Sequence, residues 1–274
     1  MPITLKEAFD KRHRGAMIKH DHFFDIYDSH LSHLQNKNLK ILEIGVYNGG
    51  SLYMWKNYFP NSKVTGLDID PYCKRWAEPD KDINVYIGDQ CDTDFLKEVC
   101  EKEGPFDLII DDGGHINHQI ITSFEFLFDY LKEGGTYVVE DTFASYYPKY
   151  GDNESDREIG TRGEILNPVL KPFDKNNTSM EFLKSLTDKL NVWAYRSDEA
   201  GELKKTGKID KYEKSLYSMH FYDCIVFINK ITRPGNNPGE NSFGKDVWYE
   251  HIDRNKEYMI DPVTKTNGYG YKED

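Results

Sequence analysis

Between residues 40 and 139, short β-forming segments alternate with segments of helical pattern. The β-forming segments are residues 40–45, 63–68, 83–87, 106–111 and 136–139, and the helical ones are 51–58, 93–102 and 117–131. Strands that alternate with helices usually pair in parallel, through right-handed crossovers that place helices on both faces of the sheet. We therefore predict an α/β fold with a doubly wound, seven-stranded, mostly parallel sheet.

The flanking segments complete the predicted organisation. Residues 5–36 are amphipathic with helical spacing, which predicts an N-terminal helical cap over residues 1–36. A core over residues 37–230 follows, and a tail over 231–274 has no assigned role. Late in the core we expect a helix over 179–190 and strands over 191–195, 218–222 and 224–228, the last two antiparallel.

Within this core, periodicity is lost between residues 142 and 178, where Gly, Asn, Asp and Pro are frequent. A segment this long without its own secondary structure is usually a lid, a binding loop or a disordered segment. We therefore predict a lid or substrate loop over residues 142–178.

The charge balance limits the possible partners. The chain has 274 residues, with 35 Lys and Arg against 47 Asp and Glu and a net charge of −12. A protein this acidic is not expected to bind nucleic acid or an anionic membrane as its main partner. It has no apolar segment of membrane-spanning length and no C-x-x-C pair, so we expect a cytoplasmic protein with reduced thiols.

A glycine-rich turn follows the first predicted strand, with the sequence Glu43-Ile44-Gly45-Val46-Tyr47-Asn48-Gly49-Gly50-Ser51. Glycines allow a tight turn and a close approach of the backbone to a ligand at a helix start. The spacing departs from the G-x-G-x-x-G pattern of dinucleotide sites. Glu43 suits a ligand with a cationic amino group and a sulfonium better than one with phosphates. The alternative is a structural turn in another kind of α/β protein.

Polar residues also end the next strands. Asp68 ends the second strand, where a carboxylate can accept hydrogen bonds from ribose hydroxyls. Asp89 and Gln90 follow the third strand, where they can meet an adenine amino group, and Asp111 ends the fourth. Carboxylates at strand ends are often simple caps, but this ordered set indicates a site for a nucleoside-containing cofactor.

A second group of acidic residues follows the fourth and fifth strands. Because these strands should be adjacent and parallel, about 5 Å apart, we expect Asp112 to lie close to Glu140 and Asp141. Three carboxylates in one cleft repel unless they are protonated or bind a cation, and oxygen ligands favour Mg²⁺ or Mn²⁺. His115 can accept a proton there. The alternatives are His118, one helical turn further on, or a His115 that only caps the helix.

These motifs resemble those of class I S-adenosylmethionine (SAM)-dependent methyltransferases across about residues 38–142. The Asp-Asp-Gly-x-His and Glu-Asp motifs, with Lys19-x-x-His22-x-x-x-x-Tyr27 and His220-Phe221-Tyr222-Asp223, resemble the metal-dependent sugar O-methyltransferases over residues 19–230.

The resemblance implies a site for SAM and a divalent cation. Its cofactor-binding residues are Glu43, Gly45 and Asp111 around the methionine part, Asp68 at the ribose, Asp89 and Gln90 at the adenine, and Ser51. It further implies that Asp112, Glu140 and Asp141 hold the ion, that a vicinal sugar diol completes its coordination, and that His115 is the base. The acceptor is a nucleotide-linked hexose or heptose, or a glycosylated product. Relatives tend to be oligomers, so a homo-oligomer is possible by analogy.

Two other functions remain open. Two carboxylates and a histidine can hold Fe(II), which suits a hydroxylase on the same frame. The chain can also be a SAM-binding protein without catalysis. We expect His20 and His30 at the surface or in packing, because they lack metal-ligand spacing with acidic partners. His220 and Tyr222 can approach the site, but alternation in a buried strand explains them equally well.

Overall fold

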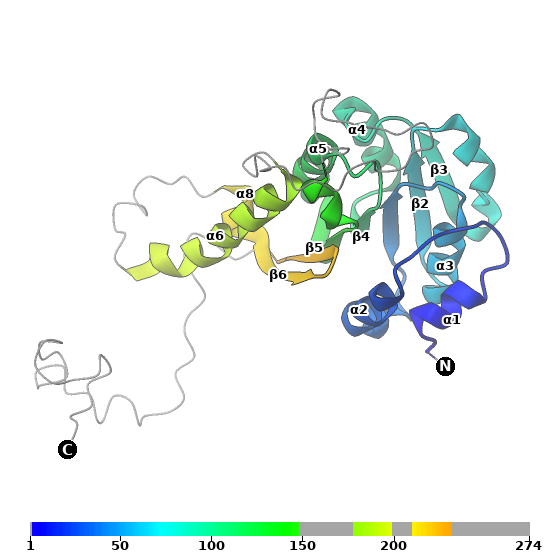
Figure 1. Cartoon of the computed structure of the whole chain (residues 1–274), viewed down its shortest axis with the longest axis horizontal. Helices are drawn as coiled ribbons and strands as arrows, with labels where there is room; N and C mark the ends of the chain where they lie inside the picture. Colours follow the sequence, from blue (N-terminus) through cyan, green and yellow to red (C-terminus); the bar gives the residue numbers. More distant parts are fainter. Residues whose placement is uncertain (1, 148–177, 199–209, 232–274) are drawn as a thin grey trace, which may run out of the picture. The chain divides into compact units, whose positions relative to one another are not determined.

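The computed structural model describes residues 2–147, 178–198 and 210–231, with side chains up to residue 191 in the second range (Figure 1). Its sheet has seven strands in the order β3-β2-β1-β4-β5-β7-β6. The strands are β1 (Lys40–Ile44), β2 (Lys63–Asp68), β3 (Ile83–Ile87), β4 (Phe106–Asp111), β5 (Leu131–Val139), β6 (Leu216–Tyr222) and β7 (Ile225–Lys230). The first five pair in parallel, and β7 pairs antiparallel with both β5 and β6. The predicted fold class is confirmed.

Helices cover both faces of the sheet (Figure 1). They are α1 (Leu5–Asp10), α2 (Asp21–Leu31), α3 (Gly50–Tyr58), α4 (Thr93–Glu103), α5 (Asn117–Leu127), α6 (Ser179–Asp198) and the short α8 (Lys211–Ser215). None of the helices in the described ranges has the length and apolar content needed to cross a membrane.

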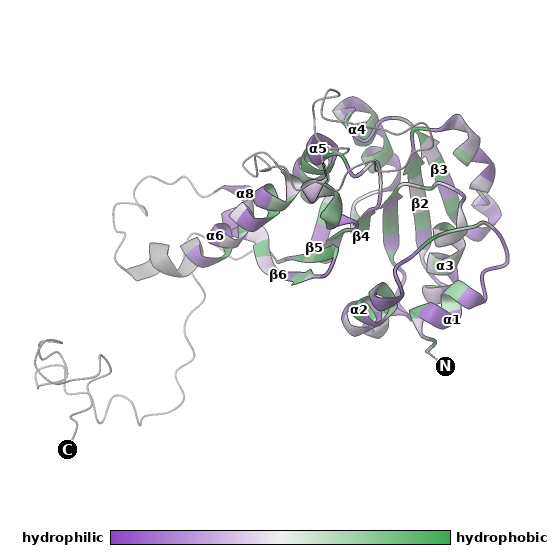
Figure 2. Ribbon diagram, in the orientation of Figure 1, coloured by the Kyte–Doolittle hydropathy of each residue, from purple (hydrophilic) through white to green (hydrophobic). Residues whose placement is uncertain are grey.

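The strands divide the hydrophobic core into two layers, because successive side chains point to opposite faces. In β4, Leu108 and Ile110 join a cluster with α1, α2 and α3, whereas Ile109 joins a cluster with α4, α5 and α6. Figure 2 shows hydrophobic colour along the strands and mixed colour on the helices. The chain order reverses between β1 and β4, and ligands of doubly wound sheets bind at the carboxyl ends of the strands beside such a reversal.

The N-terminal segment is not one continuous helical region. Between α1 and α2, residues 15–20 form an extended segment that we call the strap. Ala16 N donates to Asn48 O at 3.1 Å, and Gly50 N donates to Ala16 O at 3.2 Å, so the strap is attached to the glycine turn after β1. Gly15 begins the strap with φ +77°, a conformation that ends any continuous helix here.

Two other predictions of secondary structure were wrong. The expected strand over 191–195 lies inside α6, because a short apolar run does not distinguish a strand from a buried helix. Strand β5 begins at Leu131 and contains Gly134 and Gly135, whereas the strand was expected over residues 136–139 and residue 131 in the preceding helix. The pairing register shifts between Phe106 and Leu108 opposite this part of β5, which is where glycines are tolerated in a strand.

The predicted lid is described only in part. Residues Thr142–Tyr146 form a 3-10 helix, residues 148–177 lie outside the described ranges, and Thr178 precedes α6. Most of the predicted tail also lies outside them.

Substitution of Gly15 tests the attachment of the strap. A Cβ atom at Gly15 would lie 2.5 Å from Gly50 N, whereas Gly134, with φ +76°, has no heavy atom within 4 Å of its Cβ position. We expect Gly134→Ala to lower the free energy of unfolding by about 1–2 kcal/mol through backbone strain alone. Gly15→Ala should cost about 1–3 kcal/mol more because of the added clash. Urea unfolding measures both; equal losses would contradict the tight contact.

Candidate active site

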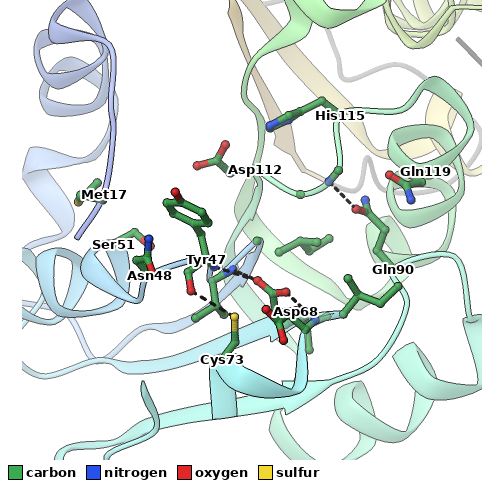
Figure 3. A pocket seen from close by; sticks show the side chains of 18 of the residues that line it. Met17, Tyr47, Asn48, Ser51, Asp68, Cys73, Gln90, Asp112, His115 and Gln119 are labelled. Carbon is green, nitrogen blue, oxygen red and sulfur yellow. Dashed lines mark hydrogen bonds between the residues drawn. The ribbon is translucent and has the colours of Figure 1, made fainter. Parts of the chain in front are cut away.

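A cavity of about 490 Å³ opens at the carboxyl ends of the central strands (Figure 3). Its wall is formed by the strap, the glycine turn, the ends of β2 and β3, and the loop after β4. Asp141, which follows β5, completes the wall. This is the edge of the sheet where the sequence placed the cofactor.

Gly45 brings the glycine turn close to the loop after β4. Its φ of +94° is in the region that favours glycine, and a Cβ atom there would lie 2.0 Å from the backbone oxygen of Asp112. Gly45 N donates to Leu67 O at 2.8 Å, which extends the pairing of β1 with β2. The turn therefore has a fixed position between β2 and β4.

Asp68 organises the same turn. Its Oδ2 accepts hydrogen bonds from Val46 N at 2.8 Å and Tyr47 N at 2.9 Å, and its Oδ1 accepts one from Asp70 N (Figure 3). The Asp68 carboxylate therefore both lines the cavity and holds the glycine turn in place.

Gln90 joins the ends of β3 and β4. Its Oε1 accepts from Gly114 N at 3.0 Å, and its Nε2 donates to Asp111 Oδ1 and Ser123 Oγ, both at 3.3 Å. Figure 3 shows Gln90 turned toward the loop after β4. All these partners belong to the protein, so Gln90 positions this loop even though it lies in the cavity wall.

Two predicted cofactor residues do not line the cavity, because their carboxylates are buried and have internal partners. Glu43 accepts from Ser51 Oγ at 2.6 Å and from Trp55 Nε1 at 2.9 Å. Asp111 accepts from Ser123 Oγ at 2.6 Å, and burial raises its pKa. Glu43 accepts a hydrogen bond from Ser51, and Asp111 accepts one from Gln90. Because Ser51 and Gln90 line the cavity, both carboxylates support its wall from the protein interior.

Asp112, His115 and Asp141 come together at one side of the cavity. Each offers a ligand atom, and these atoms lie within 4.8 Å of one another. His115 Nε2 lies 3.6 Å from Asp141 Oδ2. The two carboxylates supply oxygen ligands that suit a divalent cation, so they fit the predicted ion, and the imidazole of His115 lies beside them.

His20 approaches the same group from the strap. Its Nε2 lies 3.5 Å from Asp141 Oδ1. The prediction of a surface or packing role for His20 was therefore incomplete, because the strap carries it to an acidic residue 121 positions away in the chain. His30 instead contacts Tyr222 OH through Nε2 at 2.9 Å, in a cluster with His220 that does not line the cavity.

Glu140 has a different environment from the other predicted metal ligands. It is buried, and its Oε1 and Oε2 accept from Lys19 Nζ at 2.7 and 2.5 Å. Tyr27 OH donates to Glu140 Oε1 at 2.5 Å, and Lys19 Nζ also donates to Asp112 Oδ2 at 3.2 Å. The structure therefore brings Glu140 next to Asp112, as predicted, with a lysine between them.

The charges explain this arrangement. Burial and the neighbouring Asp112 raise the pKa of Glu140 to about 7, an effect that Lys19 opposes. Burial lowers the pKa of Lys19, but the carboxylates of Asp112 and Glu140 outweigh burial and raise it. Lys19 is therefore a permanent cation. Sequence reasoning gave it no role, although the Lys19-x-x-His22-x-x-x-x-Tyr27 motif contains two of the residues that contact Glu140.

The predicted site residues thus fall into two groups. Those that line the cavity are Gly45, Ser51, Asp68, Asp89, Gln90, Asp112, His115 and Asp141. Those that lie behind its wall are Glu43, Asp111 and Glu140.

Residues 42–142 match a family described as a methyltransferase domain. This part of the chain is a methyltransferase domain. The chain is 33% identical over 211 residues to the mycinamicin VI 2''-O-methyltransferase of Micromonospora griseorubida, a match that covers 74% of this chain and 47% of that relative. It is 34% identical over 221 residues to the demethylmacrocin O-methyltransferase of Streptomyces fradiae, covering 78% and 50%. The chain therefore spans about half the length of these curated relatives.

A solved structure gives the same result. The MycE methyltransferase from the mycinamycin biosynthetic pathway, in complex with Mg, SAH and mycinamycin VI, superposes with a TM-score of 0.66 at 29% identity. The match covers 88% of this chain and 57% of MycE. The predicted resemblance to sugar O-methyltransferases is confirmed.

The buried Glu43 makes the stability of the domain depend on pH. Burial raises the pKa of Glu43 from 4.5 to about 7. Between these values the folded protein binds more protons than the unfolded one, so the free energy of unfolding falls as the pH rises. Glu43→Gln removes this titration. We expect the stability of the unsubstituted protein relative to Glu43→Gln to fall by about 3 kcal/mol from pH 4.5 to pH 7, measured by urea unfolding. If the difference in free energy of unfolding between the two proteins does not change with pH, Glu43 does not have the raised pKa that burial of its carboxyl group predicts.

Proposed function

We propose that the protein is a SAM-dependent and divalent-metal-dependent O-methyltransferase that transfers a methyl group to a sugar hydroxyl. The observation that carries this proposal is the group of Asp112, His115 and Asp141 in the wall of the cavity formed by the glycine turn. One cavity therefore offers a cofactor pocket and a cation site side by side. The names of the relatives support the same reaction class.

The cofactor pocket is formed by the residues that line the cavity beside the turn. We assign the methionine part to Gly45 and Ser51, the ribose to Asp68, and the adenine to Asp89 and Gln90. Glu43 and Asp111 support this pocket from behind. When bound, SAM supplies an activated methyl group and the ion supplies the positive charge that acidifies an alcohol.

We call the residues after β4 and β5 the acidic side of the site; they are Asp112, His115, Glu140 and Asp141. In this proposal they orient and deprotonate the acceptor. Asp112 and Asp141 would hold the ion, with Glu140 as the third ligand, and two neighbouring sugar hydroxyls would complete its coordination. His115 would accept the hydroxyl proton at Nε2, where Asp141 Oδ2 at 3.6 Å stabilises the imidazolium.

The acceptor in this proposal is a hexose or heptose, either nucleotide-linked or part of a glycosylated product. The two relatives described above are named for mycinamicin VI and demethylmacrocin, and a further relative, from Streptomyces olivaceus, is named as the 2'-O-methyltransferase of a rhamnosyl tetracenomycin C. The net charge of −12 supports a small-molecule acceptor rather than nucleic acid or a membrane. The four cysteines are free, which supports a cytoplasmic location. We propose residues 37–230 as the catalytic core, with residues 1–36 packed on it.

Substitutions at the acidic side test the assigned roles. We expect His115→Ala and Asp112→Asn each to lower kcat about 100-fold or more, because they remove the base and a metal ligand. The affinity for SAH, measured by calorimetry, should stay within about threefold, since neither residue is assigned to the cofactor pocket. His118→Ala is the control and should keep its activity. Loss of SAH binding in both variants would show that these residues belong to the cofactor pocket and not to the catalytic group. If His118→Ala is inactive and His115→Ala is active, His118 is the base.

Removal of the metal distinguishes the proposed reaction from its rivals. We expect a chelator to abolish methyl transfer to a sugar diol and Mg²⁺ or Mn²⁺ to restore it, measured with a labelled methyl donor. Full activity in excess chelator would eliminate the role of the metal. Oxygen uptake with Fe(II) and no formation of SAH would instead identify a hydroxylase. SAH binding without turnover of any diol would identify a non-catalytic binding protein.

A further inference from the structure

The strap joins the two halves of the proposed site. At one end Ala16 pairs with the glycine turn, and Met17 and Ile18 line the cavity. At the other end Lys19 and His20 reach the acidic residues after β4 and β5. Figure 3 shows Met17 on the side of the cavity near Ser51 and Asn48. The position of Lys19 is therefore fixed from both sides by backbone contacts and by its ion pairs.

Lys19 is in contact with two of the three proposed metal ligands. Its side chain is 1% exposed, and its Nζ lies 2.5 Å from Glu140 and 3.2 Å from Asp112. The Glu43 carboxylate, when it is ionised, also raises the pKa of Lys19. A divalent ion held by Asp112 and Glu140 therefore shares these carboxylates with a cation that the protein itself supplies.

We propose that Lys19 is a positioning residue that acts as an internal counter-ion of the metal site. It fixes the carboxylates of Asp112 and Glu140, and its charge repels the divalent ion that binds them. Lys19 thereby keeps the acidic site assembled without the ion and limits the affinity for the ion, so that the ion exchanges readily. This inference rests on the proposed function, because it requires that Asp112 and Glu140 bind a metal.

If Lys19 is a counter-ion, its removal changes the affinity for the divalent ion in the opposite direction from removal of a purely structural residue. Removal of a packing residue from a metal site disorders the ligands and weakens binding. Removal of a competing positive charge strengthens binding, because like charges at short range repel strongly in a buried site. Lys19→Met keeps most of the side-chain length without the charge. We expect it to bind Mn²⁺ at least about tenfold more tightly than the unsubstituted protein.

Mn²⁺ binding to the full chain is measured by electron paramagnetic resonance of the free ion, in the presence of SAH. All variants are compared at one pH above the range in which carboxylates titrate. The activity of Lys19→Met should fall despite the tighter binding, since Asp112 and Glu140 lose the group that orients them.

A second pair of variants covers the case in which Lys19→Met does not fold, because it leaves Glu140 buried without its cation. Glu140→Gln removes the negative partner, and the double variant Lys19→Met/Glu140→Gln removes both charges and keeps an acceptor for Tyr27 OH. We expect the double variant to bind Mn²⁺ at least about tenfold more tightly than Glu140→Gln alone.

The outcomes separate the two proposals. Equal or weaker Mn²⁺ binding without Lys19, in folded variants of an ion-binding protein, overturns the counter-ion role and leaves the proposed function intact. If the unsubstituted protein binds SAH but no Mn²⁺, the metal-dependent function and the counter-ion role both fail.

Discussion

Backbone hydrogen bonds continue the pairing of the sheet beyond the ends of its strands, and the site depends on three of them. Gly45 N donates to Leu67 O at 2.8 Å, Asp112 N to Ile44 O at 3.0 Å, and Glu140 N to Asp111 O at 2.9 Å. Each bond ties the first residue after a strand to one of the last two residues of its neighbour. The side chains that follow β1, β4 and β5 therefore share one edge, although about a hundred residues separate the first from the last. The parallel register brings the cofactor turn and the acidic residues together.

Much of the site could be predicted for this reason. In a parallel sheet the carboxyl ends of adjacent strands lie next to each other at one edge. The strand pattern alone therefore predicts that Asp112 lies beside Glu140 and Asp141. The strand pattern does not predict the direction in which each side chain points. Glu43 and Asp111 stand at the strand ends as expected, but they point into the interior, where Trp55 and Ser123 donate to them. Their internal partners lie on helices, and no strand pattern shows which side chains of a helix face a given carboxylate.

The role of Lys19 was missed for a related reason. The sequence predicts that three converging carboxylates need a proton or a cation, and a divalent ion satisfies that requirement without a lysine. The structure provides a cation of its own in Lys19, which lies 93 residues from Asp112 and 121 from Glu140. The strap that carries it has no regular periodicity, so its path across the sheet edge follows only from the tertiary structure. The motif that links Lys19 to Tyr27 was visible, but its meaning depends on Glu140, which both residues contact.

The backbone is strained at three residues that line the cavity. Tyr47, His115 and Asp141 have φ values of 47°, 57° and 51°, in a region that non-glycine residues rarely adopt, and all three line the cavity. Each such residue costs about 1–3 kcal/mol, and glycine would avoid most of that cost. Glycine has no imidazole or carboxylate, so it cannot replace His115 or Asp141 in the roles proposed for them. The strain therefore follows from the need to turn the chain sharply after β4 and β5 while keeping a functional side chain at the turn. It also restricts the positions of His115 and Asp141, and a rigid arrangement of the proposed base and the proposed metal ligand favours one geometry of ion and acceptor over others.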